Sequence, residues 1–121
     1  MRSITEADIP TIKLWYAARG LEIDAGMLPK LGLIIDDVCA CFLYISLEKC
    51  AMIEGLVSNP MANPKVAYVG IHKVIDGLTK LAEDFGAKYT IAIIKSESVV
   101  KIGKKLGYKD HGMFKVLVKG L

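Results

Sequence analysis

The feature that most constrains the fold is an apolar stripe in residues 69–85. Apolar side chains recur at helical spacing, at Val69, Ile71, Val74, Ile75, Leu78, Leu81, Ala82 and Phe85. Charged residues lie between them, and Gly86 follows as a typical helix stop. This pattern predicts an amphipathic helix over about Tyr68 to Phe85, with Ile75, Leu78 and Ala82 packed on a sheet.

The residues before this helix predict a three-stranded meander. Its apolar runs are Leu31 to Ile35, Val38 to Leu47 and Cys50 to Val57, with short polar turns between them. Antiparallel pairing about the Glu48-Lys49 turn would place Leu43 opposite Glu54. The same pairing would place five apolar side chains on one face of the sheet: Cys39, Cys41, Ile45, Met52 and Leu56. Glu54 is then the one ionisable residue on an otherwise apolar stretch.

The remaining elements complete an α/β (α+β by some schemes) single domain over residues 1–121. We expect a first strand at 1–4, a helix from Ile9-Pro10 to Gly20, a covering loop at 21–30, a strand at 89–94, a helix between Ser96 and Gly107, and a return to strand from Tyr108 through Met113 to Val118. No repeat or linker interrupts this order.

Composition favours a globular protein of the cytoplasm. Hydrophobic residues make up 53% and charged residues 24% of the chain, which leaves room for a partly apolar surface such as a homodimer interface. No apolar run approaches the roughly 20 residues that span a bilayer, and the first residues lack the apolar core of a signal peptide. We therefore expect no membrane association.

Charge is divided unevenly along the chain. Residues 1–62 carry five basic and eight acidic side chains, whereas residues 63–121 carry eleven lysines and five acids. A lysine-rich half could attract nucleic acid or hold the phosphates of a cofactor. Because that half has no arginine, we expect no specific nucleic-acid recognition.

The three cysteines predict free thiols rather than a disulfide or a metal site. Cys39 and Cys41 are two residues apart on an expected strand, where side chains lie about 7 Å apart, too far for an easy disulfide. Neither His nor acidic residues accompany them at zinc-ligand spacing, so we expect buried structural thiols and no metal.

The order of elements and three motifs resemble the acyl-CoA N-acyltransferase (GNAT) family. The opening Ile4 to Trp15 is similar to the start of that family, in which Asp-Ile-Pro leads into the first helix. The segment Ser96 to Tyr108 resembles the family's Asn-x-x-Ala-x-x-Leu-Tyr-x-Lys-x-Gly-Phe. The central helix reproduces L-x-x-L-x-x-x-A-x-x-x-G at Ile75, Leu78, Ala82 and Gly86. The resemblance covers nearly the whole chain and implies the GNAT fold.

The resemblance also implies a binding site for acetyl-CoA as co-substrate. Strands four and five of the family separate at a bulge, so the thioester carbonyl would meet the backbone amides of Leu56, Val57 and Ser58. The phosphates would lie near Lys65, Gly70, Ile71 and His72. Val69 and Ile71 stand where the family has the loop's glycines, and a solvated helix start is the alternative reading of this segment.

Two residues are candidates for proton transfer. Glu54 could act as general base for the amine, or be a carboxylate satisfied by local hydrogen bonds. The family's helix tyrosine corresponds to Gly103, and Tyr108 is the nearest substitute, with packing in the core as its alternative. Ser96 and Ser98 could hydrogen-bond the pantetheine arm, and Ser96 could instead cap the helix.

These residues imply transfer of an acetyl group from acetyl-CoA to an amine on a small molecule or a protein. The alternative is a non-catalytic GNAT-derived binding or structural protein, as in compact viral or bacterial relatives. We expect the acceptor pocket to be built from Leu21 to Lys30 and the last hairpin.

Overall fold

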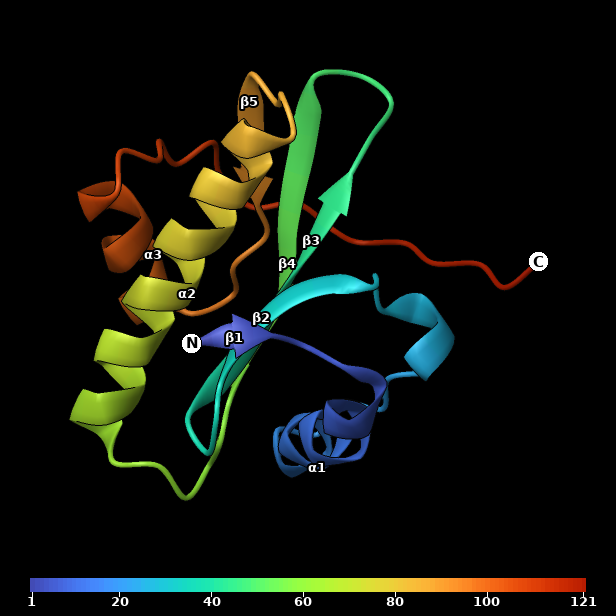
Figure 1. Cartoon of the computed structure of the whole chain (residues 1–121), viewed down its shortest axis with the longest axis vertical. Helices are drawn as coiled ribbons and strands as arrows, with labels where there is room; N and C mark the ends of the chain where they lie inside the picture. The colour runs from blue at the N-terminus through green and yellow to red at the C-terminus, as the bar shows by residue number, and fades with distance from the viewer.

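The computed structural model of the chain describes all of residues 1–121 and contains one five-stranded sheet in the order β1-β2-β3-β4-β5. Helix α1 lies on one face of the sheet, and α2 and α3 lie on the other (Figure 1). The strands are β1 (Arg2–Ser3), β2 (Leu31–Ile35), β3 (Cys39–Ile45), β4 (Cys50–Ser58) and β5 (Tyr89–Ala92). The helices are η1 (Glu6–Asp8), α1 (Ile9–Ala18), η2 (Ala25–Met27), α2 (Pro64–Asp84) and α3 (Glu97–Lys105). The predicted α/β class is confirmed.

The meander of β2, β3 and β4 is confirmed, but its predicted register is wrong by one residue. Leu43 pairs with Ile53, and Glu54 pairs with Phe42. The connection turns between Ser46 and Cys50, where the Ser46 amide donates to the Cys50 carbonyl at 3.3 Å, so three residues and not two form the tip. One extra residue moves every later side chain of β4 to the other face, which takes Met52 away from Cys39 and Cys41.

A β-bulge in β4 restores part of the predicted pattern. Between Ala40 and Phe42 the pairing shifts, so that Gly55 and Leu56 together face Cys41 of β3. Leu56 thereby packs on the same side as Cys39 and Cys41, while Val57 packs with α1 on the other side.

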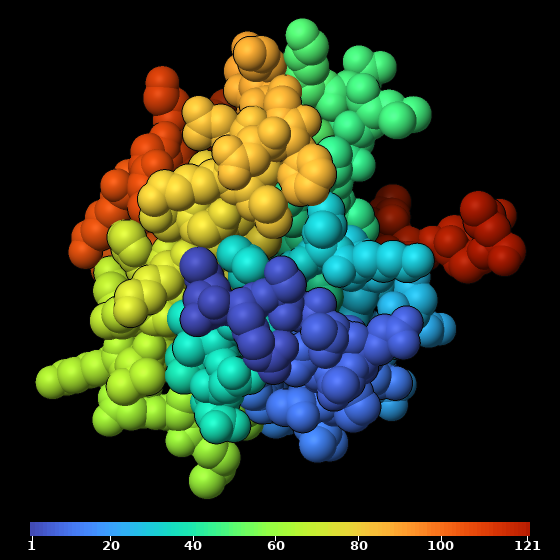
Figure 2. Space-filling view, viewed as in Figure 1, coloured from blue at the N-terminus to red at the C-terminus, as the bar shows by residue number.

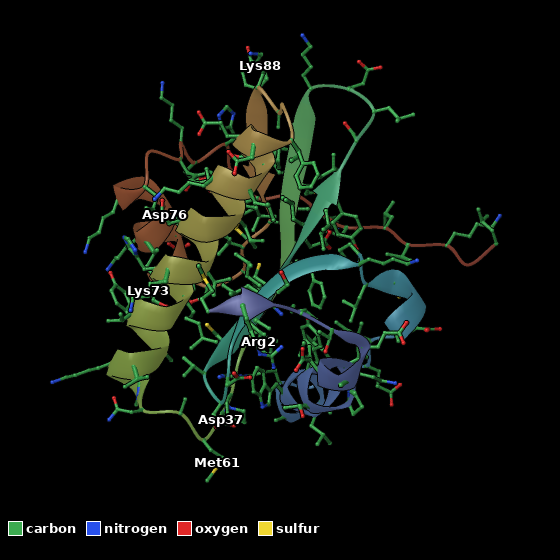
Figure 3. The ribbon with its side chains drawn as sticks, viewed as in Figure 1. Arg2, Asp37, Met61, Lys73, Asp76 and Lys88 are labelled. Carbon is green, nitrogen blue, oxygen red and sulfur yellow. The ribbon has the colours of Figure 1, made fainter.

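Helix α2 begins at Pro64, four residues before the predicted start. Asn63 precedes it, and the Asn63 Oδ1 accepts a 2.9 Å hydrogen bond from the Lys65 amide. An Asn cap followed by Pro at the first helical position is a strong start signal. The predicted apolar stripe is confirmed, since Ile75, Leu78 and Ala82 are buried against the sheet. Lys73 and Asp76 lie on the side of α2 away from the sheet (Figure 3).

The three cysteines are free thiols, as predicted. Cys39 and Cys41 are buried under α2, and Cys50 is half-buried. Burial raises the pKa of Cys39 to about 11 and that of Cys41 to about 12. Both thiols are therefore protonated at neutral pH and act as small apolar side chains.

The predicted last strand is wrong, because the chain after α3 forms none. Beyond Tyr108 the backbone makes no hydrogen bond to another backbone group, although the sequence from Met113 to Val118 is typical of a strand. A strand exists only when a neighbour completes its hydrogen bonds, and no neighbour lies beside this segment. Among the helices, none has the length and apolarity that a bilayer-spanning segment needs.

Candidate active site

The candidate site lies where β5 stops accompanying β4. The two parallel strands are paired from Cys50 with Tyr89 to Ile53 with Ala92, and the Ile93 amide donates the last hydrogen bond, 3.0 Å to the Ile53 carbonyl. Residues 54–58 of β4 continue without a strand on that edge. The predicted separation of the fourth and fifth strands is thus present, and it coincides with the bulge.

The bulge directs two of the three predicted backbone amides toward the unpaired edge. Asn59 donates to the Val38 carbonyl at 2.8 Å, and Val57 is paired with Ala40, so these two residues bond to β3. Alternation along the strand turns the amides of Ser58 and Leu56 the other way. The amide of Val57, in contrast, is used inside the sheet. Alternation thus predicts two donors on one edge, the arrangement that a carbonyl oxygen accumulating negative charge requires.

Gly55 makes the bulge possible. Its φ of +73° lies in the left-handed region, and a Cβ there would come within 2.9 Å of the Tyr16 hydroxyl oxygen and 3.2 Å of the Phe42 ring. The Tyr16 hydroxyl donates a hydrogen bond to the Gly55 carbonyl. Burial raises the pKa of Tyr16, so its hydroxyl keeps its proton at neutral pH. Helix α1 thereby fixes the bulge.

Glu54 stands next to this bulge, on the α1 face of the sheet. Its side chain lines a small cavity of about 80 Å³ together with Phe42, Tyr44 and Gly55. The loop after α1 closes the other side with Ile23, Met27, Leu28 and Pro29. No group of the protein donates a hydrogen bond to the Glu54 carboxylate. The alternative in which local hydrogen bonds satisfy this carboxylate is therefore wrong. Both of its oxygens are available to a ligand.

Tyr44 holds the covering loop over this cavity. Its hydroxyl donates a 2.7 Å hydrogen bond to the Met27 carbonyl, and Asp24 accepts one of 2.9 Å from the Gly26 amide. Burial, with a smaller contribution from the nearby Glu54, raises the pKa of Tyr44. The predicted covering role of Leu21 to Lys30 agrees with this geometry, whereas no last hairpin exists to complete the pocket.

The structure separates the predicted phosphate-binding residues. Gly70 lies in the second turn of α2, buried, and a Cβ there would be 2.7 Å from the Val38 Cγ1 and 3.3 Å from the Cys39 Sγ. Its role is close packing of helix on sheet, and its amide lies inside the helix. Ile71 packs on the same core, and His72 is half-buried. Only Lys65 is exposed at the helix start, where the Asn63 side chain already accepts the Lys65 amide.

Ser96 and Ser98 are exposed at the start of α3 and bond to each other, with 2.7 Å between their hydroxyl oxygens. Ser96 occupies the N-cap position, but its side chain caps no backbone amide. The capping alternative is therefore wrong, and both hydroxyls remain accessible.

Tyr108 is not brought to Glu54. Its hydroxyl lies 2.7 Å from the Thr79 Oγ1 of α2 and accepts a 2.9 Å hydrogen bond from the Thr90 Oγ1 of β5. Thr90 is paired with Ala51, at the closed end of the β4–β5 pair, and Tyr108 packs on the α2 side of the sheet. This geometry fits its packing alternative.

Tyr16, Tyr44 and Gly55 belong to the site but were missed from sequence. An isolated glycine within a strand pattern is a recognised bulge signal, and Gly55 could have been found by it. The two tyrosines act through contacts 39 and 17 residues away along the chain, for which no local pattern exists.

Solved structures of acetyltransferases share this architecture over their whole length. A protein of Agrobacterium tumefaciens str. C58 assigned to the acetyltransferases superposes with a TM-score of 0.72, at 12% identity over 98% of each chain. A Trypanosoma brucei acetyltransferase gives 0.65, at 14% identity over 98% of this chain and 97% of that one. Glucosamine-6-phosphate N-acetyltransferase from Arabidopsis thaliana gives 0.65, at 13% identity over 97% and 95%.

The chain has the GNAT acetyltransferase fold. At these identities the likeness establishes the fold alone. No protein-family model matches the sequence, and no curated protein does. Within the GNAT fold the bulge, Glu54, Leu56 and Ser58 lie on the same strand, β4, while the start of α2 lacks the glycines expected beside it.

Proposed function

We propose that the protein transfers an acetyl group from acetyl-CoA to a primary amine. The observation that carries the proposal is that β5 stops pairing at Ile53 just before β4 bulges, so that residues 54–58 of β4, which include the unbonded carboxylate of Glu54, form an edge without a neighbouring strand. The amides of Leu56 and Ser58 receive the thioester carbonyl oxygen and stabilise its negative charge as the amine attacks. This edge needs no particular side chain, which makes it tolerant of sequence change.

Glu54 is proposed as the general base. An ammonium group entering the cavity under Tyr44 and Met27 loses a proton to Glu54, directly or through one water molecule. The amine nitrogen then bonds to the carbonyl carbon, the carbon–sulfur bond breaks, and the nitrogen gives up its second proton to water. The thiolate of coenzyme A leaves and takes a proton from solvent, and Glu54 returns its own proton to solvent. Because Tyr108 is held by Thr79 and Thr90, it has no part in this sequence.

The proposed site has few groups that can bind the phosphates of acetyl-CoA. Lys65 supplies one exposed positive charge at the start of α2, and Ser96 and Ser98 offer hydroxyls to the pantetheine arm. Gly70 and Ile71 lie within α2 and pack toward the sheet, so the proposal gives them no phosphate contact. We therefore propose a modest affinity that falls as salt rises, since an exposed charge is screened by counterions.

The start of α2 also favours a second function. The Asn63 cap and the closed packing of Gly70 leave little of a phosphate loop, as expected of a GNAT-derived binding or structural protein without catalysis. Such a protein would use the cavity at Glu54 for an amine-bearing partner alone.

Release of free thiol from acetyl-CoA, measured with a panel of primary amines, separates the two functions. We expect wild-type turnover with at least one amine, and a loss of kcat of about 100-fold or more in Glu54→Gln. Glu48→Gln changes an equally charged residue at the exposed tip of the β3–β4 turn and should leave kcat unchanged. Equal turnover in Glu54→Gln and wild type would exclude Glu54 as base. Absence of turnover together with absence of acetyl-CoA binding would favour the non-catalytic function.

A further inference from the structure

The cavity beside Glu54 has mostly apolar walls and a single charge. The apolar residues that line it are Ile23, Met27, Leu28, Pro29 and Phe42. Glu54 is the only charged residue among the lining residues, which include no lysine, arginine or histidine. Tyr44, the remaining polar side chain, uses its one proton in the 2.7 Å hydrogen bond to the Met27 carbonyl. The cavity therefore offers a carboxylate to one cation and no side-chain donor to an anion.

The order of the strands places this charge on one side of the cavity. Glu54 lies on β4, next to the edge that β5 leaves unpaired, whereas Phe42 and Tyr44 lie on β3, one strand farther from that edge. An acceptor with its nitrogen at Glu54 and the acyl group at the unpaired edge therefore extends its carbon chain toward β3. The covering segment, residues 21–30, lies over this space and packs beside α1 (Figure 2). The carbon chain of the acceptor then lies among apolar and aromatic side chains.

The size of the cavity limits the length of this carbon chain. One water molecule needs about 10 to 15 Å³ of such space, so a cavity of about 80 Å³ holds roughly five to eight non-hydrogen atoms. An amine nitrogen with about four to six carbons fills it. A phosphorylated sugar or a nucleotide has too many atoms to enter.

We propose that the acceptor is a short aliphatic monoamine of about four to six carbons, bound with its nitrogen at Glu54 and its uncharged chain toward β3. This inference rests on the proposed function and names its substrate class. A carboxylate at the far end of the chain would lie in an apolar space without a donor to pair with. A second ammonium there would also lose its water without gaining a partner, because Glu54 is already paired with the first. Both groups should make an acceptor poor.

Turnover of amines of matched length tests the class of acceptor. We expect kcat/KM for n-butylamine to exceed that for 4-aminobutanoate and for 1,4-diaminobutane by about tenfold or more. From ethylamine to n-butylamine, each added methylene should raise kcat/KM about fourfold, because it fills apolar space. Beyond about six carbons the gain should stop. An amino acid or a diamine turned over as well as n-butylamine would overturn the inference and leave the proposed function standing.

Met27→Ala enlarges the cavity without changing its charge. Met27 lines the cavity but is 49% exposed, so its replacement should leave the fold intact. Longer chains should then fit, and the ratio of kcat/KM for n-octylamine to that for n-butylamine should rise about tenfold. Met61→Ala removes the same side chain from an exposed position before α2 and should leave this ratio unchanged. An unchanged ratio in Met27→Ala would place the acceptor elsewhere and overturn the inference.

Binding of the amine alone separates this inference from the proposed function. In protein with isotope-labelled methionine methyl groups, n-butylamine at millimolar concentration should shift the Met27 resonance in a saturable way and leave that of Met61 unchanged. Such a shift without release of thiol from acetyl-CoA would support the monoamine site and count against the proposed function alone. No shift at Met27, or an equal shift with 4-aminobutanoate, would overturn the inference.

Discussion

On one face of the sheet, the 21-residue α2 lies across the central strands around a cluster of eleven buried residues, whereas the ten-residue α1 and its following loop cover the other face around seven. On the α2 face the first half of the helix packs closely, since a Cβ on Gly70 would lie 2.7 Å from the Val38 Cγ1. The α1 face leaves a cavity beside Glu54. Stability and candidate chemistry thus occupy opposite faces of the same two strands, β3 and β4. Changes on the two faces should therefore have different consequences.

The largest expected effect is unfolding by Leu78→Asp on the α2 face. Leu78 is completely buried in the middle of the helix stripe, and an unpaired carboxylate there costs more than the roughly 5 to 15 kcal/mol margin of a small domain tolerates. Far-ultraviolet circular dichroism should show loss of the folded state. Lys80→Asp places the same side chain two residues away in solvent and should retain the fold. A folded Leu78→Asp protein would contradict the assignment of the core to this face.

High pH should lower the stability of the folded state through the two buried thiols on the α2 face. The folded-state pKa values of Cys39, about 11, and Cys41, about 12, lie above that of an unfolded thiol. A raised pKa gives stability that is complete below the unfolded value, near 9, and is lost as pH rises toward the folded one. The free energy of unfolding should then fall by about 1.4 kcal/mol per pH unit for each thiol. Urea unfolding between pH 8 and 11 measures this slope, and Cys39→Ala should make it shallower. An unchanged slope would show that Cys39 does not contribute.

Gly70→Val separates close packing from phosphate binding. The added side chain would meet Val38, Cys39 and Ile35, so we expect a loss of about 1 to 3 kcal/mol by overpacking. Thermal denaturation measures it, with the exposed Lys73→Val as the control for adding valine to α2. Full stability with lost acetyl-CoA binding would instead restore Gly70 to a phosphate site.

The smallest expected effect lies on the α1 face, in Tyr16→Phe. The change removes the hydroxyl that donates to the Gly55 carbonyl and should cost about 1 kcal/mol of stability. Its effect on kcat should exceed what this loss implies, because the bulge that orients the Leu56 and Ser58 amides is no longer held from α1. Unfolding in urea and turnover of the same preparation give both quantities. Intact turnover would mean that the bulge keeps its form without Tyr16.

Prediction from sequence succeeded where a pattern repeats over many residues. Helix α2 was predicted because its apolar stripe has many members. The prediction missed the first four residues of the helix, although Asn63 and Pro64 are a typical start signal. The predicted register of β3 and β4 was wrong because it depends on the number of residues in the turn after Ser46. The composition of the turn does not show whether it has two residues or three. The strand at Met113 to Val118 failed for a different reason, since local sequence cannot supply the neighbour that a strand needs.

The residues predicted for the candidate site came from two kinds of signal. Leu56 and Ser58 followed from the family resemblance, and Glu54 from its isolation on an apolar stretch. The predicted phosphate-binding residues do not form one loop, because the helix begins four residues earlier than predicted and Gly70 packs toward the sheet. Contacts such as that of Tyr16 with Gly55 arise from tertiary packing and leave no trace in local spacing.

The central claim, that β4 presents two backbone amides to an acyl thioester, is tested most directly by following backbone amide resonances while acetyl-CoA is added. The amides of Leu56 and Ser58 should shift in a saturable way, and that of Val57, bonded to β3, should shift less. Resonances of Thr79 and Lys80, on α2 away from this edge, should stay unchanged. Shifts at Leu56 and Ser58 at or below millimolar acetyl-CoA are the result we predict. No shift at either amide at that concentration would contradict the account.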